Sequence, residues 1–452
     1  MPVFEARTEI EAPAAEAFRW HARPGAFVRL SPPWNRVDVL EARGGIENGA
    51  RLVMRLGSPP LSIEWVAVHR GYEEGRRFVD EQESGPFAAW VHEHLFEDAP
   101  SGRSVVVDRI DYTIPFGKLG ELAAGALTRR RLDRLFRFRG AITAGDLARH
   151  APYFGQAPLR IAITGASGLI GSQLAAFLTA GGHEVLRFAR GRTARAGEIA
   201  WNPASGRIDH EALEGLDAVI HLAGENIAGG RWTAERKAEI LASRVNGTKL
   251  LAEALSVLRN PPGVFLSASA VGYYGDRGEE RVDEAALPGT GFLAQVARAW
   301  ESGTEPAEAA GIRTLRMRFG VILTARGGAL AKMLIPFKLG AGGPIGSGRQ
   351  GFSWIALDDA IYTVHHLIRH DEIRGPVNVV APAPATQREF AAALGTALRR
   401  PAFVPLPESV VRRLFGQMGE EALLQGQFVE PGALRRSGFT WSAASLPEAL
   451  GR

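Results

Sequence analysis

Apolar and polar positions form two different patterns along the chain, which divide it near residue 140. Before that point, short segments of alternating apolar and polar residues are separated by turn-forming clusters rich in glycine, proline and serine. After it, strand-length apolar runs alternate with segments of helical periodicity, as in the βαβ units of a parallel sheet. The pattern predicts an α+β domain followed by an α/β domain.

The first part is predicted to contain a strand, a helix, six further strands and a long helix, in that order. The first strand is expected at 4–10 and the first helix at 13–20, where Pro13 occupies the first turn. The six strands are expected at 36–40, 50–56, 61–70, 76–81, 88–96 and 104–114. Apolar residues at helical spacing predict the long helix at 118–138.

The second part begins with a buried strand that leads directly into a glycine-rich turn. Gly165, Gly168 and Gly171 follow the strand at intervals of three, before a helix predicted at 167–179. Such a turn brings backbone N–H groups and the positive end of a helix close to a pyrophosphate. We therefore predict a dinucleotide site, formed by Thr164, Gly165, Ser167, Gly168, Leu169, Ile170, Gly171, Leu222, Ala223 and Gly224. The alternative is a parallel α/β domain whose glycines serve packing alone.

The end of the next strand, predicted at 184–190, bears on the choice of cofactor. A dinucleotide fold that binds NAD usually carries an acidic residue there, but this chain has Arg190, with Arg187 and Arg192 beside it. An arginine pairs with the 2′-phosphate of NADP, so we expect NADP(H) in preference to NAD(H). The alternative is that these arginines form a solvated strand end.

Composition narrows the class of protein. At 452 residues with 46% hydrophobic content, the chain is expected to form two or three soluble domains. The absence of cysteine excludes disulfides, a cysteine nucleophile and thiolate metal ligands. A net charge of +4, from 53 basic and 49 acidic residues, does not indicate nucleic-acid binding. Neither a signal peptide nor an apolar run of about 18 residues is visible, so a cytoplasmic protein without a membrane span is expected.

The order of elements in the first part resembles the START-like helix-grip fold of the polyketide cyclase/dehydrase-like group, and the segment Ile10–Phe18 resembles the start of that fold. The resemblance implies a curved sheet and a long helix that enclose a cavity for an apolar ligand. Trp65, Trp90 and Phe96 are candidate lining residues, although we favour an ordinary core position for each of them.

His92 and His94 lie two residues apart, on one face of the strand predicted at 88–96. Two imidazoles at this spacing are able to bind a metal ion, but the sequence shows no third ligand at a meaningful spacing. We therefore expect solvated strand positions at both histidines, and no metal site is predicted.

Five stretches of the second part resemble the atypical extended short-chain dehydrogenase/reductase group, and more narrowly its sugar-nucleotide epimerase-like members. These stretches are 164–171, 221–232, 243–248, 267–275 and 348–354, and the similarity extends over about 159–450. The resemblance implies an α/β fold, with a Rossmann-type doubly wound parallel sheet and a small C-terminal α/β extension. It also implies a proton transfer to or from a substrate oxygen, for which the wider superfamily uses a Tyr-x-x-x-Lys pair and a serine.

The catalytic pattern of that superfamily is only partly present. Ser269 matches the serine, but Phe292 and Val296 occupy the two positions of the Tyr-x-x-x-Lys pair, and neither transfers a proton. Tyr273 or Tyr274 is the candidate acid, because both follow Ser269 at the carboxyl end of a strand, where ligands bind in open α/β sheets. The alternative for both tyrosines is a packed turn.

A polar substrate is expected to contact the loop that follows another strand end, through Glu225, Asn226 and Arg231. Glycines between 340 and 348 predict a mobile loop that closes over a ligand, with an irregular surface crossing as the alternative.

We expect four parts: a helix-grip domain at 1–140, a linker at 141–157, a dinucleotide-binding domain at 158–375 and an extension on the substrate side at 376–452. Three functions follow. The first is an NADP-dependent oxidoreductase or epimerase that acts on a small molecule. The second is a non-catalytic NADPH-binding or sensing module, which the missing Tyr-x-x-x-Lys pair favours. The third is a carrier of an apolar ligand in the first domain. The oligomeric state is left open.

Overall fold

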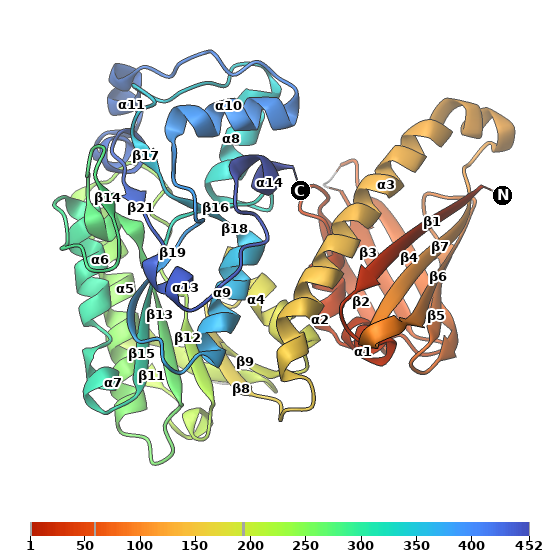
Figure 1. Ribbon diagram of the computed structural model, residues 1–452, viewed down its shortest axis with the longest axis horizontal. Helices are drawn as coiled ribbons and strands as arrows, with labels where there is room; N and C mark the ends of the chain where they lie inside the picture. The colour runs from red at the N-terminus through yellow and green to blue at the C-terminus, as the bar shows by residue number, and fades with distance from the viewer. Residues whose placement is uncertain (1, 58–59, 192–194, 452) are drawn as a thin grey trace. The chain divides into compact units, whose positions relative to one another are not determined.

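The computed structural model describes residues 2–57, 60–191 and 195–451 (Figure 1). It forms two compact units. The first comprises the chain up to Pro158 together with 176–183, and the second comprises 159–175 and the chain from Glu184 onward.

The first unit contains a seven-stranded sheet in the order β1-β7-β6-β5-β4-β3-β2, in which every neighbouring pair is antiparallel. A long helix, α3, packs against this sheet, with its Phe136 among Phe4, Trp90 and Ile110 (Figure 1). The helix-grip fold is confirmed, and so is the predicted order of elements, except that a short helix, α2, which was not predicted, follows α1. The elements are β1 (Val3–Ile10), α1 (Ala14–Ala22), α2 (Gly25–Leu30), β2 (Val37–Arg43), β3 (Arg51–Leu56), β4 (Ile63–Glu73), β5 (Arg77–Ser84), β6 (Ala89–Ala99), β7 (Arg103–Thr113) and α3 (Gly117–His150).

The three aromatic residues considered as cavity lining belong to the packed interior of this unit. Trp90 and Phe96 are buried in apolar clusters. Trp65 is partly buried and packs edge-on against Trp90, with ring centroids 5.1 Å apart. Each residue therefore has the core position that was favoured from the sequence.

The long helix extends further than predicted. It continues to His150, so the residues 141–150, which were expected to form a linker, are helical. Gly145 favoured a linker, but tertiary contacts hold the segment in the helix. Leu147 is buried, and Asp146 forms a buried ion pair with Arg29, with Arg29 Nη2 2.7 Å from Asp146 Oδ1.

The second unit is built on an eight-stranded sheet in the order β11-β10-β9-β8-β12-β13-β15-β19. All neighbouring pairs are parallel except the edge hairpin of β10 and β11. The strand order reverses between β8 and β12, so the predicted Rossmann-type doubly wound sheet is confirmed. These strands are β8 (Arg160–Thr164), β9 (Glu184–Arg190), β10 (Glu198–Asn202), β11 (Arg207–Ile208), β12 (Ala218–His221), β13 (Val264–Ala270), β15 (Arg313–Phe319) and β19 (Gly375–Val379).

Helices and three small two-stranded sheets complete this unit (Figure 1). The helices are α4 (Leu169–Ala180), whose residues from Ala176 onward belong to the first unit, α5 (Ala234–Ser256), α6 (Phe292–Ser302), α7 (Glu305–Ala309), α8 (Gly328–Lys338), α9 (Leu357–Arg369), α10 (Gln387–Leu398), α11 (Glu408–Phe415), α12 (Gln417–Gly419), α13 (Gly432–Arg436) and α14 (Leu446–Leu450). The small sheets pair β14 (Arg281–Val282) with β21 (Phe428–Val429), β16 (Val321–Leu323) with β18 (Trp354–Ala356), and β17 (Gly351–Phe352) with β20 (Ala385–Thr386).

The glycine-rich segment at 340–348 is packed against 404–406. Val404 donates its N–H to the carbonyl of Gly342 at 3.1 Å, and Gly346 donates to Leu406 at 2.9 Å. A Cβ on Gly343 would lie 2.2 Å from the carbonyl oxygen of Val404, so this close approach requires glycine. These contacts favour the irregular crossing, and closure over a ligand stays a prediction.

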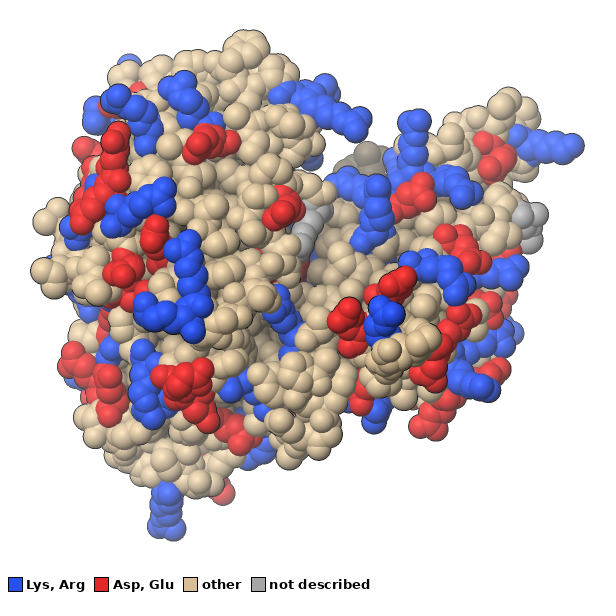
Figure 2. Space-filling view, in the orientation of Figure 1, with Lys and Arg blue, Asp and Glu red and all other residues tan. Residues whose placement is uncertain are grey.

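Charged side chains of both signs are interspersed over the face shown in Figure 2, in keeping with the small net charge of +4. None of the helices in the described part of the chain is both long and apolar enough to cross a membrane.

Candidate functional site

The glycine turn follows the carboxyl end of β8, where the strand order of the sheet reverses. Gly165 has a φ of +66°, and a Cβ there would lie 2.9 Å from the carbonyl carbon of Leu222. A Cβ on Gly171 would lie 2.2 Å from the carbonyl oxygen of Gly165. Gly168 is exposed, and a Cβ there would lie 3.1 Å from its nearest neighbour, which is also the carbonyl oxygen of Gly165. The chain's own packing thus requires Gly165 and Gly171, whereas Gly168 leaves the backbone open to a ligand.

The start of α4 presents a positive electrostatic end beside this turn. The helix begins at Leu169 and has no acidic residue in its first turn. Ser167, just before the helix, is exposed. The N–H groups of a first helical turn have no partner within the helix, so they are available to an anion. The turn therefore has the backbone arrangement that a phosphate group requires, and the binding of a cofactor there stays a prediction.

Thr164 connects the ends of β8 and β12. Its Oγ1 accepts the N–H groups of Leu222 and Ala223, at 3.0 and 3.2 Å, and lies 2.7 Å from Nδ1 of His221. Burial lowers the pKa of His221 to about 3, so its ring is neutral. The Thr164 hydroxyl must then donate to Nδ1, which places the imidazole proton on Nε2. This arrangement fixes the backbone of 222–223, which is part of the predicted cofactor site.

Arg190 lies exposed at the end of β9, as predicted, while Arg192 lies outside the described residues. Glu225 is close enough that the charge of Arg190 contributes to lowering its pKa, although a hydrogen bond from Arg236 Nη2, at 2.9 Å, is the larger cause. Arg190 and Glu225 therefore lie close enough for their charges to interact.

The other two candidate substrate residues belong to the loop that follows Glu225, and both are exposed. Asn226 accepts the N–H of Ala228 through its side chain at 2.9 Å. Arg231 donates to the carbonyl oxygen of Arg413 at 2.6 Å, which connects this loop to the end of α11. Their role in substrate binding stays a prediction.

Ser269 lies in a buried network of polar side chains. Its hydroxyl donates to Glu301 Oε1 at 2.7 Å, and Arg318 donates to both oxygens of Glu301 at 2.8 Å. Arg318 also donates to the hydroxyl of Tyr274 at 2.9 Å, and that hydroxyl donates to Asn378 Oδ1 at 2.7 Å. The network joins the predicted serine and one predicted tyrosine.

The two candidate tyrosines differ in access to solvent. Tyr274 is fully buried, and burial raises the pKa of its hydroxyl to about 12. Tyr273 is partly exposed, and its hydroxyl makes no hydrogen bond to the described residues. Its ring stacks on the guanidinium of Arg318, 3.5 Å from the ring centroid. Tyr273 is therefore the tyrosine that a ligand is able to reach.

The helix that carries the Tyr-x-x-x-Lys pair in related enzymes is α6. Val296 is buried, and Phe292 is partly exposed and packs edge-on against Trp232. Glu421 accepts the N–H groups of Phe292 and Leu293 at the start of this helix, at 3.1 and 2.8 Å. The first turn of α6 is thus capped by a carboxylate of the chain itself.

Sequence reasoning missed Glu301, Arg318 and Asn378. Two signals were available: Glu301 ends the predicted helix that carries Phe292, and Arg318 lies between the apolar residues Met317 and Phe319 in a buried strand. A charged residue inside such a strand needs a buried partner of opposite charge. The identity of that partner depends on tertiary folding.

The expectation of solvated positions at His92 and His94 was wrong. Both are buried in the first unit, where Asp80 and Asp108 of the neighbouring strands face their ring nitrogens. Burial alone lowers the pKa of His92, but the charge of Asp80 and hydrogen bonds to both aspartates raise it to about 9.

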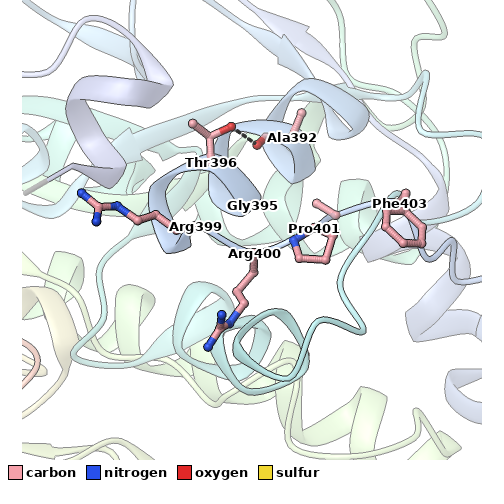
Figure 3. A pocket seen from close by; sticks show the side chains of 8 residues that line it. Ala392, Gly395, Thr396, Arg399, Arg400, Pro401 and Phe403 are labelled. Atoms are coloured by element: carbon pink, nitrogen blue, oxygen red, sulfur yellow. Dashed lines mark hydrogen bonds between the residues drawn. The ribbon is translucent and has the colours of Figure 1, made fainter.

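A surface hollow of about 570 Å³ lies beside the end of α10, within the C-terminal extension (Figure 3). Thr396, Arg399, Arg400 and the exposed Phe403 are among its lining residues, and the Thr396 hydroxyl donates to the carbonyl of Ala392 at 3.0 Å. None of the lining residues belongs to the predicted cofactor or catalytic set.

Three family models match parts of the sequence. Residues 161–380 match the NAD dependent epimerase/dehydratase family, and residues 10–138 match the polyketide cyclase/dehydrase and lipid transport family. Residues 406–452 match a domain of unknown function, DUF1731.

A curated relative, the epimerase family protein Mb2239 of Mycobacterium bovis, is 44% identical over 293 residues, which cover 64% of this chain and 96% of that protein. The chain belongs to the epimerase family. Its second unit has the NAD(P)-binding fold of the short-chain dehydrogenase/reductases, and its first unit has the START-like fold, as the sequence resemblances implied.

Two solved structures resemble this epimerase-family protein. One is a nucleoside-diphosphate sugar epimerase from Corynebacterium glutamicum, with 31% identity and a TM-score of 0.80, covering 99% of this chain and 90% of that chain. The other is the human epimerase family protein SDR39U1 with NADPH, with 37% identity and a TM-score of 0.60, covering 65% of this chain and 98% of that chain.

Proposed function

We propose that this epimerase-family protein is an NADP(H)-dependent oxidoreductase or epimerase. The single observation that carries the proposal is the exposed Gly168 turn, which lies beside a helix start without acidic residues at the reversal of the strand order. Backbone N–H groups and the helix dipole there suit the pyrophosphate of a dinucleotide. Thr164 fixes 222–223 next to the same turn.

NADP(H) is proposed over NAD(H) because of the charge at the end of β9. Arg190 occupies the position from which a side chain reaches the adenosine ribose, and a guanidinium there pairs with a 2′-phosphate. The human relative SDR39U1, whose structure contains NADPH, supports this assignment.

The catalytic assignment rests on Ser269 and Tyr273. Ser269 lies just before the turn that holds Tyr273, and the Arg318 guanidinium stacks against the Tyr273 ring. A ligand can reach the Tyr273 hydroxyl, whereas the Tyr274 hydroxyl is occupied by Arg318 and Asn378. In this proposal Tyr273 transfers the proton, and the bound nicotinamide supplies or takes the hydride.

Nucleoside-diphosphate sugars are the first substrates to test, because the relative from Corynebacterium glutamicum that covers both units is described as an epimerase of such compounds. Glu225, Asn226 and Arg231 are the proposed residues for their polar groups. Arg231 is the best placed for a phosphate, because it is exposed and cationic.

The second candidate function is an NADPH-binding module without turnover. Phe292 and Val296 support it, because neither is able to transfer a proton at the Tyr-x-x-x-Lys positions. Ser269 supports it as well, because its hydroxyl donates to Glu301 inside the chain.

The experiment that separates the two functions is an epimer assay. The full chain is incubated with NADP⁺ or NADPH and a panel of nucleoside-diphosphate sugars, and the products are separated chromatographically. An enzyme interconverts at least one pair of epimers, and Ser269→Ala and Tyr273→Phe each lower the rate by about 10²-fold or more. Both variants should keep the wild-type affinity for NADPH. Tight NADPH binding without conversion of any sugar would favour the binding module.

A further inference from the structure

Two aspartates and two histidines meet on one face of the sheet in the first unit. Asp80 on β5 pairs in register with His92 on β6, and His94 pairs in register with Asp108 on β7. The two histidines share a face because they are two residues apart on one strand. The histidine side chains are 3% and 7% exposed, that of Asp108 is 12% exposed, and that of Asp80 is 21% exposed. The pairing of three strands thus builds a buried cluster from residues 80–108.

One oxygen of Asp80 faces both imidazoles. Oδ2 of Asp80 lies 3.1 Å from Nδ1 of His92 and 3.2 Å from Nε2 of His94. In a tetrahedral zinc site with bonds of about 2.0–2.1 Å, neighbouring ligand atoms are about 3.3 Å apart. Two of the three separations are therefore close to those of a zinc site, and all three ligand atoms lie within 4.8 Å of one another.

Asp108 faces the opposite ring nitrogens. Its Oδ1 accepts a hydrogen bond of 2.9 Å from Nε2 of His92 and lies 2.9 Å from Nδ1 of His94. A histidine that binds a metal through one nitrogen usually donates the other N–H to a carboxylate, which orients the ring. Asp108 occupies that position for His92, and the same oxygen lies close to the corresponding nitrogen of His94.

Hydrogen bonding within the cluster is incomplete. Nδ1 of His94 is close to Asp108, but it lies outside hydrogen-bonding angles, so this buried nitrogen lacks a hydrogen-bond partner in the described part of the chain. Buried polar atoms are nearly always paired, and an exception indicates a missing ligand or a functional group. A small rotation of the ring toward a metal on Nε2 would also redirect Nδ1.

We propose that Asp80, His92 and His94 bind one zinc-type divalent metal ion inside the first unit, and that Asp108 orients the two imidazoles. Imidazole and carboxylate ligands suit Zn²⁺ and related transition metals better than Ca²⁺ or Mg²⁺, which take oxygen ligands alone. Three protein ligands leave the fourth tetrahedral position for water or for a polar group of a ligand.

The test uses the full chain without a polyhistidine tag. The protein is stripped with a chelator, dialysed into metal-free buffer and titrated with Zn²⁺ alone, and the bound metal is counted by elemental analysis. Co²⁺ is the spectroscopic probe, because four-coordinate Co²⁺ with nitrogen and oxygen ligands gives intense visible bands. We expect one tight site per chain, the visible spectrum of a tetrahedral site and a higher melting temperature in the presence of Zn²⁺.

Variants identify the ligands. Asp80→Asn and His94→Gln should abolish the tight site and the rise in melting temperature, with an unchanged circular dichroism spectrum. Asp108→Asn should retain one site with an affinity lower by about 10- to 100-fold, because it removes an orienting group and not a ligand. His210→Gln changes an exposed histidine of the second unit, and it should behave as the wild type.

The wild-type titration decides the proposal even if a variant fails to fold. A stripped wild-type chain that takes up no Zn²⁺ or Co²⁺ would overturn it. The cluster would then be a hydrogen-bonded network in which protonated histidines neutralise the charges of the two aspartates. A folded His94→Gln chain that still binds one tetrahedral metal with wild-type affinity would overturn it as well.

Discussion

Ser269 donates its hydroxyl to Glu301, a buried carboxylate near the end of α6, over 2.7 Å. In the Tyr-x-x-x-Lys enzymes of the superfamily, the same helix supplies the catalytic pair. In this chain it supplies Phe292 and Val296 at those positions, and a carboxylate that holds Ser269 and Arg318 nine residues after Phe292. The charged groups next to Ser269 are therefore those of the buried ion pair between Glu301 and Arg318.

The Glu301–Arg318 pair should be important for stability. Glu301→Gln leaves the buried Arg318 without its counter-charge, so the free energy of unfolding should fall by about 3 kcal/mol or more. Urea unfolding of the full chain, followed by tryptophan fluorescence, measures this change. Glu305→Gln, an exposed position shortly after Glu301, is the matched control and should leave the unfolding midpoint unchanged. Equal midpoints for the two variants would show that the pair does not stabilise the fold.

Removal of the hydroxyl should lower the stability of the chain at Tyr274 but not at Tyr273. Tyr274→Phe leaves Arg318 and Asn378 without their shared partner, so it should destabilise the chain by about 1–3 kcal/mol. Tyr273→Phe keeps the ring on Arg318 and breaks no hydrogen bond to the described residues, so its melting temperature should match the wild type. Differential scanning calorimetry of the two variants distinguishes the roles. The assignment of Tyr273 as the reachable tyrosine would fail if its variant were the less stable one.

His221 should make stability depend on pH in the acidic range. Burial lowers its pKa from 6.5 to about 3, so below pH 6.5 the unfolded chain binds a proton that the folded chain does not. Stability is therefore lost as the pH falls from 6.5 towards 3, by about 2–3 kcal/mol between pH 6.5 and 4.5 from this residue. Denaturant midpoints measured across that range test the slope.

The matched variant for this test is His221→Asn. Asparagine still offers the Thr164 hydroxyl an acceptor but does not titrate, so the variant should lose less stability than the wild type between pH 6.5 and 4.5. Parallel curves for the two proteins would mean that His221 is protonated in the folded state or is accessible to water.

The structural features that could be predicted from the sequence are those set by residues close together along the chain. The glycine turn was predicted because its three glycines, the strand before it and the helix after it are consecutive in the chain. Gly165 packs against the backbone of 222–223, and Gly171 packs against the backbone of 165–166. Both close approaches require glycine, so the requirement is visible in the sequence as a short glycine motif. The succession of strands along the chain in the first unit was predicted for the same reason, since alternation and turn signals are local. The order of these strands in the sheet was not predicted.

The parts that could not be predicted depend on which strands become neighbours. His92 and His94 looked solvated, because their partners Asp80 and Asp108 reach them through sheet register rather than through spacing along the chain. Gly140 lies in a helix that was expected to end before it. A Cβ there would lie 2.6 Å from Thr8 Oγ1, so this glycine permits close packing on β1 rather than ending the helix.

The most direct test of the central claim is a fluorescence titration of the full chain with NADPH, NADP⁺, NADH and NAD⁺. We predict tight binding of NADPH that is lost in Gly168→Val, because the larger side chain fills the space that the phosphate needs. Arg190→Ala should bind NADPH and NADH with similar affinity, while Arg187→Ala, an exposed arginine of the same strand, should keep the preference. If no dinucleotide binds, or if Gly168→Val binds NADPH as the wild type does, then the glycine turn is not a cofactor site and the proposed function is wrong.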